Sequence, residues 1–219
     1  MLLPETEMNS EYRITRDKFL SSNEARRLLK TCQEKALVDT AYGRNTWVTR
    51  YMLVHLAFNT GLRVSEIADL EIGDLFLKGI SDMYLIVRHG KGRGENGKKR
   101  DVYLDREIVK HIREYLDYKK KVLDQSVDID APFFASTGGK KFTTTGLYLS
   151  FKKALKAANI PQHYSIHSAR HTYATMLLAK TNNLRFVQKQ LGHSSINMTA
   201  LYADVLPELN HNLANSILS

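Results

Sequence analysis

The sequence predicts a mainly α-helical fold with one small antiparallel β-sheet, an α+β arrangement. Apolar residues recur at helical spacing over most of the 219 residues. Two short β-rich runs, at 84–87 and 101–104, interrupt this pattern, and a turn rich in Gly, Lys and Arg joins them. A hydrophobic fraction of 43% is sufficient for a buried core. We therefore expect one domain over 18–219, preceded by a polar tail at 1–17.

Three helices are expected before the sheet. The first begins with a capping box, in which Ser21 precedes Glu24 by three positions. The second runs from 44 to 59 and ends at Gly61, because glycine readily adopts the left-handed conformation that stops a helix. A third, short helix follows. The apolar faces consist of Ala25, Leu28, Leu29 and Cys32; of Trp47, Tyr51, Val54 and Phe58; and of Val64, Ile67 and Ala68.

Helical periodicity returns after Asp105 and continues to the end of the chain. Four apolar faces are expected there: Ile108, Ile112, Tyr115 and Leu116; Leu147, Phe151 and Leu155; Ala169, Tyr173, Met176 and Leu177; and Leu184, Val187 and Leu191. Gly192 closes the fourth of these helices. A last amphipathic helix is expected from Pro207 onward, with Leu209, Leu213 and Ile217 on its apolar face.

The composition favours a polyanionic partner. The chain has 32 Lys and Arg against 23 Asp and Glu, a net charge of +9, and neutralising DNA phosphates releases counterions. A basic surface that only aids solubility is the alternative. Cys32 is the only cysteine, so no intramolecular disulfide can form and a cytoplasmic location is expected. We see no secretion signal at 1–10 and no apolar run long enough to span a membrane.

Four separated segments carry residue types that suit phosphate chemistry. In the first, 60–67, Arg63 follows the helix-ending Gly61 and lies at the start of the next helix. A guanidinium there can donate two parallel hydrogen bonds to a phosphate. The alternative is a surface arginine, or one that forms an ion pair with Glu66.

The second segment, 88–100, contains six Lys or Arg residues and one Glu. A flexible, basic hairpin tip can follow a DNA groove and bring one ammonium group to a leaving oxygen. The same composition also suits a solvated loop whose charges serve solubility.

The third segment, 166–175, places His167 and Arg170 three positions apart on a helix, so that both can contact one anion. His171, four positions after His167, would also suit half of a zinc site. Only His193 offers a further ligand, and the chain has neither an H-E-x-x-H motif nor paired cysteines. We therefore expect no metal.

The fourth segment, 191–202, presents His193 in a loop just after Gly192, and Tyr202 follows nine residues later. Tyr202 is one of 11 tyrosines in the chain. A tyrosine considered by itself is more often a buried ring with a satisfied hydroxyl than a nucleophile.

In combination, the four segments resemble the tyrosine recombinases, also called the phage-integrase family. The signature of that family is an Arg in T-G-L-R-x-S-E, a Lys in a G-K-G hairpin, an H-x-L-R-H box, an L-G-H-S box and a Tyr nine residues on. All five features occur here in that order, between Thr60 and Tyr202, and the likeness extends from Ile14 to the C-terminus. The histidine box reads H-S-A-R-H, with Ala169 at a packing position where leucine is usual.

The resemblance implies a role for each matching position. Arg63 and Arg170 would clamp a DNA phosphate with His167 and His193 beside them, Lys91 would be the general acid, and Tyr202 the nucleophile. The hairpin is lengthened by 95–97, so Lys98 or Lys99 could lie nearer the DNA than Lys91. The further DNA contacts expected are Arg93, Lys98, Lys99 and Arg100.

The reaction that the resemblance implies is site-specific recombination of double-stranded DNA, as in integration of mobile elements. The Tyr202 oxygen would attack a phosphodiester, leaving a 3′-phosphotyrosine and a free 5′-hydroxyl, and a second strand would reverse the step without metal, ATP or cofactor. A free phenol has a pKa of about 10, so a cationic setting is needed to favour its ionised form. The alternatives are a catalytically inactive DNA-binding relative and an enzyme like the type IB topoisomerases.

The resemblance also bears on assembly. The helix expected from Pro207 would dock on a neighbouring subunit in a homo-tetramer on DNA, or else pack on its own domain. Family members usually carry an N-terminal domain that binds the core of the DNA site, and none is expected within these 219 residues. The chain is then either a short single-domain member or the catalytic part of a longer protein.

Overall fold

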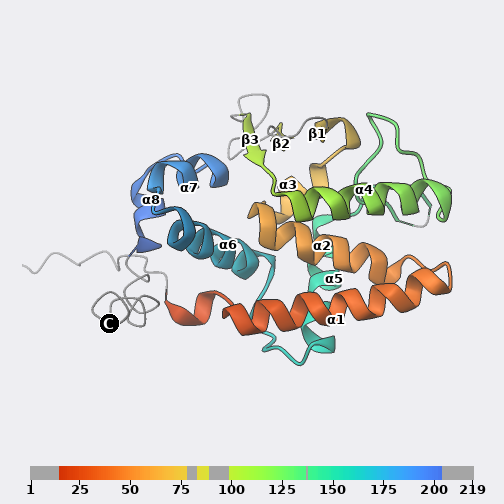
Figure 1. Cartoon of the computed structure of the whole chain (residues 1–219), viewed down its shortest axis with the longest axis horizontal. Helices are drawn as coiled ribbons and strands as arrows, with labels where there is room; N and C mark the ends of the chain where they lie inside the picture. The colour runs from red at the N-terminus through yellow and green to blue at the C-terminus, as the bar shows by residue number, and fades with distance from the viewer. Residues whose placement is uncertain (1–14, 78–82, 89–98, 137, 204–219) are drawn as a thin grey trace, which may run out of the picture.

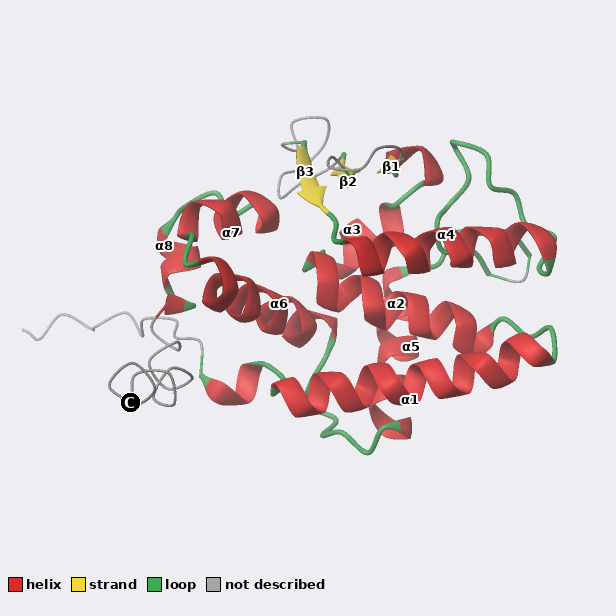
Figure 2. Cartoon of the chain, viewed as in Figure 1, coloured by secondary structure: helices red, strands yellow, loops and turns green. Residues whose placement is uncertain are grey.

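The computed structural model describes residues 15–77, 83–88, 99–136 and 138–203. Within these ranges the chain is mostly helical and has one small antiparallel sheet, which confirms the predicted fold class (Figure 2). The hairpin tip, the helix expected from Pro207 and most of the N-terminal tail lie outside the described residues. No helix in the described part is long and apolar enough to cross a membrane.

Three helices lie side by side, with α2 (Thr46–Thr60) between α1 (Ser22–Ala41) and α4 (Arg106–Lys121), as Figure 1 shows. The helix α5 (Thr144–Ala157) packs against α1 and α2 from behind in that view. Because α2 contacts helices on several sides, most of its residues are buried, and its sequence is apolar around much of its circumference.

The ends of these helices follow the expected local rules. Ser21 accepts a hydrogen bond from the Glu24 backbone at 3.2 Å, and the Glu24 carboxylate accepts one from the Ser21 backbone at 2.7 Å. Gly61 ends α2 in the left-handed conformation, with φ of 59°. A Cβ at this position would lie 2.5 Å from the Tyr173 ring, so the chain can turn here toward α3 (Val64–Asp69) only with glycine.

The sheet contains one more strand than expected in the described part of the chain. Its order is β1 (Leu75–Phe76), β2 (Tyr84–Val87) and β3 (Arg100–Tyr103), all antiparallel, and Val87 pairs with Arg100 at the base of the hairpin. The two-residue β1 is too short to produce an alternating pattern. A short 3-10 turn, Ile72–Asp74, leads into it.

A second, smaller core joins α6 (Ile166–Thr181) and α7 (Leu184–Leu191) to the residues that follow α8 (Asn197–Ala200). Its buried members are Phe19, Ala174, Leu178, Val187, Leu191 and Tyr202. Met176 was expected on the inward face of α6 but is 48% exposed, because the side that meets α7 holds Ala174 and Leu178 instead. In Figure 1 this group of helices lies beside the end of α2, which brings distant segments of the sequence together.

Candidate active site

A cavity of about 390 Å³ opens where the start of α3 meets α5 and the first turn of α6. It is lined by Leu62, Arg63, Val64, Ser65, Tyr148, Ser165, Ile166, His167 and Arg170. Three of the predicted site residues therefore share one cavity, although about 100 positions separate the first from the others in sequence.

Arg63 precedes the first residue of α3 and is held there by Glu66. Its Nη1 donates to Glu66 Oε1 at 2.8 Å, and its backbone N–H donates to Glu66 Oε2 at 2.8 Å. The expected alternative, an ion pair with Glu66, is thus present. It does not exclude a phosphate, because a guanidinium has five N–H donors and the Arg63 side chain is 26% exposed.

Arg170 is 2% exposed and binds two backbone carbonyls. Its Nη1 donates to Gly61 O at 2.5 Å and its Nη2 donates to Leu191 O at 2.7 Å, so it connects the end of α2 to the end of α7. Burial, with the nearby charge of Arg63, lowers the pKa of Arg170 to about 10, which still leaves it cationic at neutral pH.

Arg100, which we expected to contact DNA, instead points into the protein. Its Nη1 and Nη2 bind the two oxygens of Glu66 at 2.8 and 2.9 Å, and its Nε donates to Gln190 O at 3.0 Å. The Arg100 side chain is 9% exposed and that of Glu66 is 2% exposed. Burial would raise the pKa of Glu66, but the hydrogen bonds and charges of Arg100 and Arg63 lower it to about 2.

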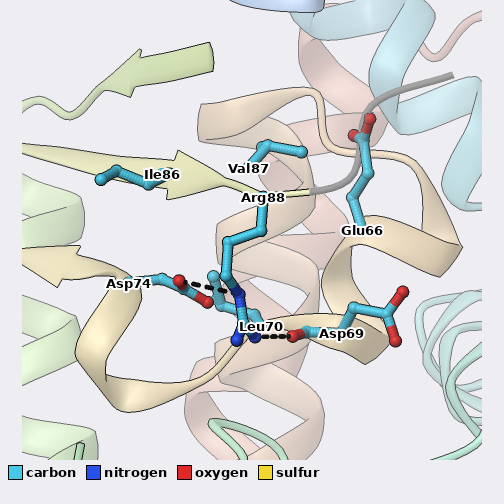
Figure 3. A pocket seen from close by; sticks show the side chains of 7 residues that line it. All are labelled: Glu66, Asp69, Leu70, Asp74, Ile86, Val87 and Arg88. Carbon is cyan, nitrogen blue, oxygen red and sulfur yellow. Dashed lines mark hydrogen bonds and ion pairs between the residues drawn. The ribbon is translucent and has the colours of Figure 1, made fainter. Parts of the chain in front are cut away.

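Arg88 anchors the other end of the hairpin. It binds Glu71 at 2.5 Å and Asp74 at 3.0 Å, and its Nη2 donates to Asp69 O at 2.8 Å. Figure 3 shows its guanidinium between Asp74 and Asp69, while the Glu66 carboxylate is directed away from that cluster. Arg88 and Arg100 therefore hold the base of the hairpin.

The remaining basic residues of this segment divide into two groups. Lys99, the residue before β3, is exposed, as a DNA contact requires. Lys91, Arg93 and Lys98 lie outside the described residues.

His193 follows Gly192, which ends α7 with φ of 65°. His193 Nδ1 lies 2.9 Å from Thr199 Oγ1. Burial and the charges of Arg170 and Arg63 lower the pKa of His193 to about 3, so its imidazole is neutral at pH 7. His167 is exposed, and desolvation and the same two arginines lower its pKa as well.

Tyr202 lies two residues after the end of α8 and is 1% exposed. Its ring stacks on His193 with centroids 6.2 Å apart and an interplanar angle of 7°. Its hydroxyl lies 2.9 Å from Nδ1 of the buried His171. The sequence had suggested only a metal-binding alternative for His171, and no local pattern indicates its contact with Tyr202. Among the described residues, no three His, Cys, Asp or Glu side chains are grouped as metal ligands.

These features define a helical protein in which a cavity lined by two arginines lies close to a tyrosine and to three histidines whose pKa values are lowered. The model of the phage integrase family matches residues 18–208, and the chain belongs to this family.

Individual relatives agree with this assignment. A tyrosine recombinase of Agathobacter rectalis is 32% identical over 173 residues, which cover 79% of this chain and 53% of that protein. The crystal structure of XerA recombinase aligns with a TM-score of 0.69 at 28% identity and covers 89% of this chain and 64% of that one. The XerH recombinase bound to palindromic difH substrate, a post-cleavage complex, gives 0.68 at 22%, with coverages of 90% and 52%. The chain thus spans about half the length of the curated relatives it matches.

Proposed function

We propose that this chain is the catalytic domain, over 18–219, of a site-specific DNA recombinase that breaks and rejoins strands through a 3′-phosphotyrosine. The observation that carries the proposal is the convergence of Arg63, His167 and Arg170 on one cavity, with His193 stacked on Tyr202. Membership of the phage integrase family supports it. So does XerH, a structural neighbour captured on its difH substrate after cleavage.

Each group has a task in the proposed reaction. Arg63 and Arg170 donate hydrogen bonds to the non-bridging oxygens as charge builds on them, and one such donor is worth on the order of 3 kcal/mol. His167 and His193 add neutral hydrogen-bond donors. Lys91 protonates the departing 5′-oxygen, with Lys98 and Lys99 as alternative acids. Since Tyr202 is buried, DNA must gain access to its hydroxyl before attack.

Covalent trapping tests the proposal. The probe is a pool of DNA duplexes with randomised centres and one nicked strand, because cleavage near the nick releases a short fragment and traps the adduct. We expect wild-type protein to form an adduct that survives denaturant, and Tyr202→Phe to bind DNA without forming one. Tyr115→Phe is the control, since Tyr115 is equally buried but lies in α4.

Each other outcome excludes the proposal or a part of it. An adduct with Tyr202→Phe removes Tyr202 as the nucleophile. DNA binding by the wild type without any adduct indicates an inactive relative. Relaxation of supercoiled plasmids that lack a recovered site indicates a topoisomerase.

The proposal extends to the assembly and its location. We infer a homo-tetramer on DNA formed through the C-terminal segment 207–219, in the cytoplasm with its substrate. Deletion of 207–219 should then leave the oligomeric state of the free protein unchanged. On DNA, the same deletion should abolish the tetramer. A tetramer that persists on DNA after the deletion contradicts this part of the proposal.

A further inference from the structure

The buried hydroxyl of Tyr202 meets the ring of His171, a residue outside the six given tasks above. His171 Nδ1 and the Tyr202 oxygen are 2.9 Å apart, and the two residues are 5% and 1% exposed. His171 follows Arg170 on α6, whereas Tyr202 follows α8. The contact therefore joins the nucleophile to the helix that carries part of the anion clamp.

We propose that His171 is a further catalytic residue, which holds the Tyr202 phenol and accepts its proton during attack on DNA. The inference rests on the proposed function. In this step the Tyr202 oxygen forms a bond to phosphorus while its proton passes to His171 Nδ1. The bond between phosphorus and the 5′-oxygen breaks, and that oxygen leaves with a proton from the Lys91 ammonium. One proton is taken up by the protein and one is given, so the step is balanced.

The environment of His171 keeps it able to accept a proton. Burial, with the charges of His167, Arg170 and Lys18, lowers the pKa of His171 to about 4. At neutral pH the ring is therefore neutral, and Nδ1 is an acceptor when Nε2 carries the hydrogen. The free phenol is a weak acid with a pKa of about 10, but it becomes far more acidic as its oxygen bonds to phosphorus. A weak base can then take the proton late in the step.

The two neighbouring histidines are placed for other tasks. His193 directs its Nδ1 to Thr199 Oγ1 at 2.9 Å and presents its face to the Tyr202 ring. The exposed His167 packs edge-on against His171, with ring centroids 4.3 Å apart. His171 thus contacts both the phenol of Tyr202 and the imidazole of the exposed His167.

Substitution by asparagine separates holding the phenol from accepting its proton. The amide oxygen in His171→Asn can accept a hydrogen bond near the position of Nδ1, but the amide does not take up a proton at neutral pH. On a synthetic nicked duplex of the sequence recovered with wild-type protein, we expect adduct formation at saturating protein to slow by about 10²-fold or more. The dissociation constant for the duplex should change little. His163→Asn, at an exposed histidine, is the matched control and should cleave at the wild-type rate.

The dependence of the rate on pH distinguishes proton transfer from a structural role. Without a base, only the phenolate attacks, so the variant rate should rise about tenfold per pH unit below the pKa of the phenol. The charged and titratable groups around His171 are His167 and Arg170 on α6, Lys18, His193 and Tyr202. Since the variant retains all of them, the ratio of wild-type to variant rates removes their shared contributions and should fall as pH rises.

Several results would overturn the inference. Cleavage by His171→Asn at the wild-type rate, or a ratio of wild-type to variant rates that does not change with pH, would show that His171 has only a structural role. Faster cleavage by the variant would show that the hydrogen bond restrains Tyr202 and slows its attack. Should urea titrations show that His171→Asn does not fold, the dependence of the rate on pH is measured for His171→Gln, whose amide also does not take up a proton at neutral pH. Absence of any wild-type adduct overturns the proposed function itself, and with it this inference.

Discussion

Replacement of Arg100 by methionine tests whether the buried Arg100–Glu66 pair stabilises the site from within. The substitution removes both hydrogen bonds to Glu66 and the one to Gln190 O while preserving most of the side-chain volume. The Glu66 side chain is 2% exposed in the wild-type structure. In the variant, Arg63 is its remaining ion-pair partner in the described part of the chain. A buried carboxylate that loses a partner is costly, because its desolvation is no longer offset.

The magnitude follows from the pKa of Glu66. Its fall from 4.5 to about 2 corresponds to about 3 kcal/mol of stabilisation, at 1.36 kcal/mol per unit. Because this folded-state pKa is depressed, the contribution is fully present above pH 4.5 and is lost as the pH falls through 2. Arg63 still lowers this pKa in the variant, so we expect Arg100→Met to reduce the free energy of unfolding at pH 7 by up to about 3 kcal/mol, and the deficit to shrink steadily below pH 4.5.

Urea unfolding, followed by the fluorescence of the only tryptophan, Trp47, measures this loss. Arg88→Met is the matched control, since Arg88 anchors the other end of the hairpin but is 32% exposed and should cost only about 1 kcal/mol. The double variant with Glu66→Gln should lose much less than the sum of the single losses. Equal losses for the two arginine variants, or a deficit independent of pH, would refute this account of Arg100.

Three further predictions concern the turn, the clamp and the DNA surface. Gly61→Ala should reduce the free energy of unfolding by about 2 kcal/mol in the same assay, because the new Cβ would lie 2.5 Å from Tyr173. The control Gly139→Ala should reduce it by only about 1 kcal/mol, because Gly139 also has a positive φ but no atom lies near its Cβ position. Arg170→Ala should reduce adduct formation by about 10²-fold or more while DNA affinity falls far less, and equal losses would make it a binding residue. Lys99→Ala should lower the slope of log affinity against log salt by about one, and an unchanged slope would exclude a phosphate contact.

Local sequence rules were sufficient to predict most of the helices. The capping box at Ser21 and the left-handed glycines at 61 and 192 act through nearest neighbours in sequence, so their consequences could be read from the chain. Met176 was predicted to be buried but is 48% exposed. Periodicity identifies the apolar face of a helix but does not show how much of that face a neighbouring helix covers.

The direction of charged side chains could not be predicted in the same way. Arg100 and Lys99 are adjacent in a basic run, yet one is buried against Glu66 and the other is exposed. The difference depends on a carboxylate 34 positions away, which a local pattern does not contain. The contact between His171 and Tyr202 likewise joins residues 31 positions apart, which a local pattern does not contain.

The Glu66 carboxylate connects the two parts of the site that sequence reasoning treated separately. It binds Arg63, which lines the cavity, and Arg100, which begins β3 at the base of the hairpin. The backbone carbonyls of Gln190 and Leu191, at the end of α7, accept hydrogen bonds from Arg100 and Arg170 in turn. A Cβ at Gly192 would lie 2.7 Å from the Arg100 side chain, so this close approach also requires glycine. A change in the position of Arg100 would therefore affect Arg63, through Glu66, and the end of α7 that precedes His193, because these contacts are closely packed.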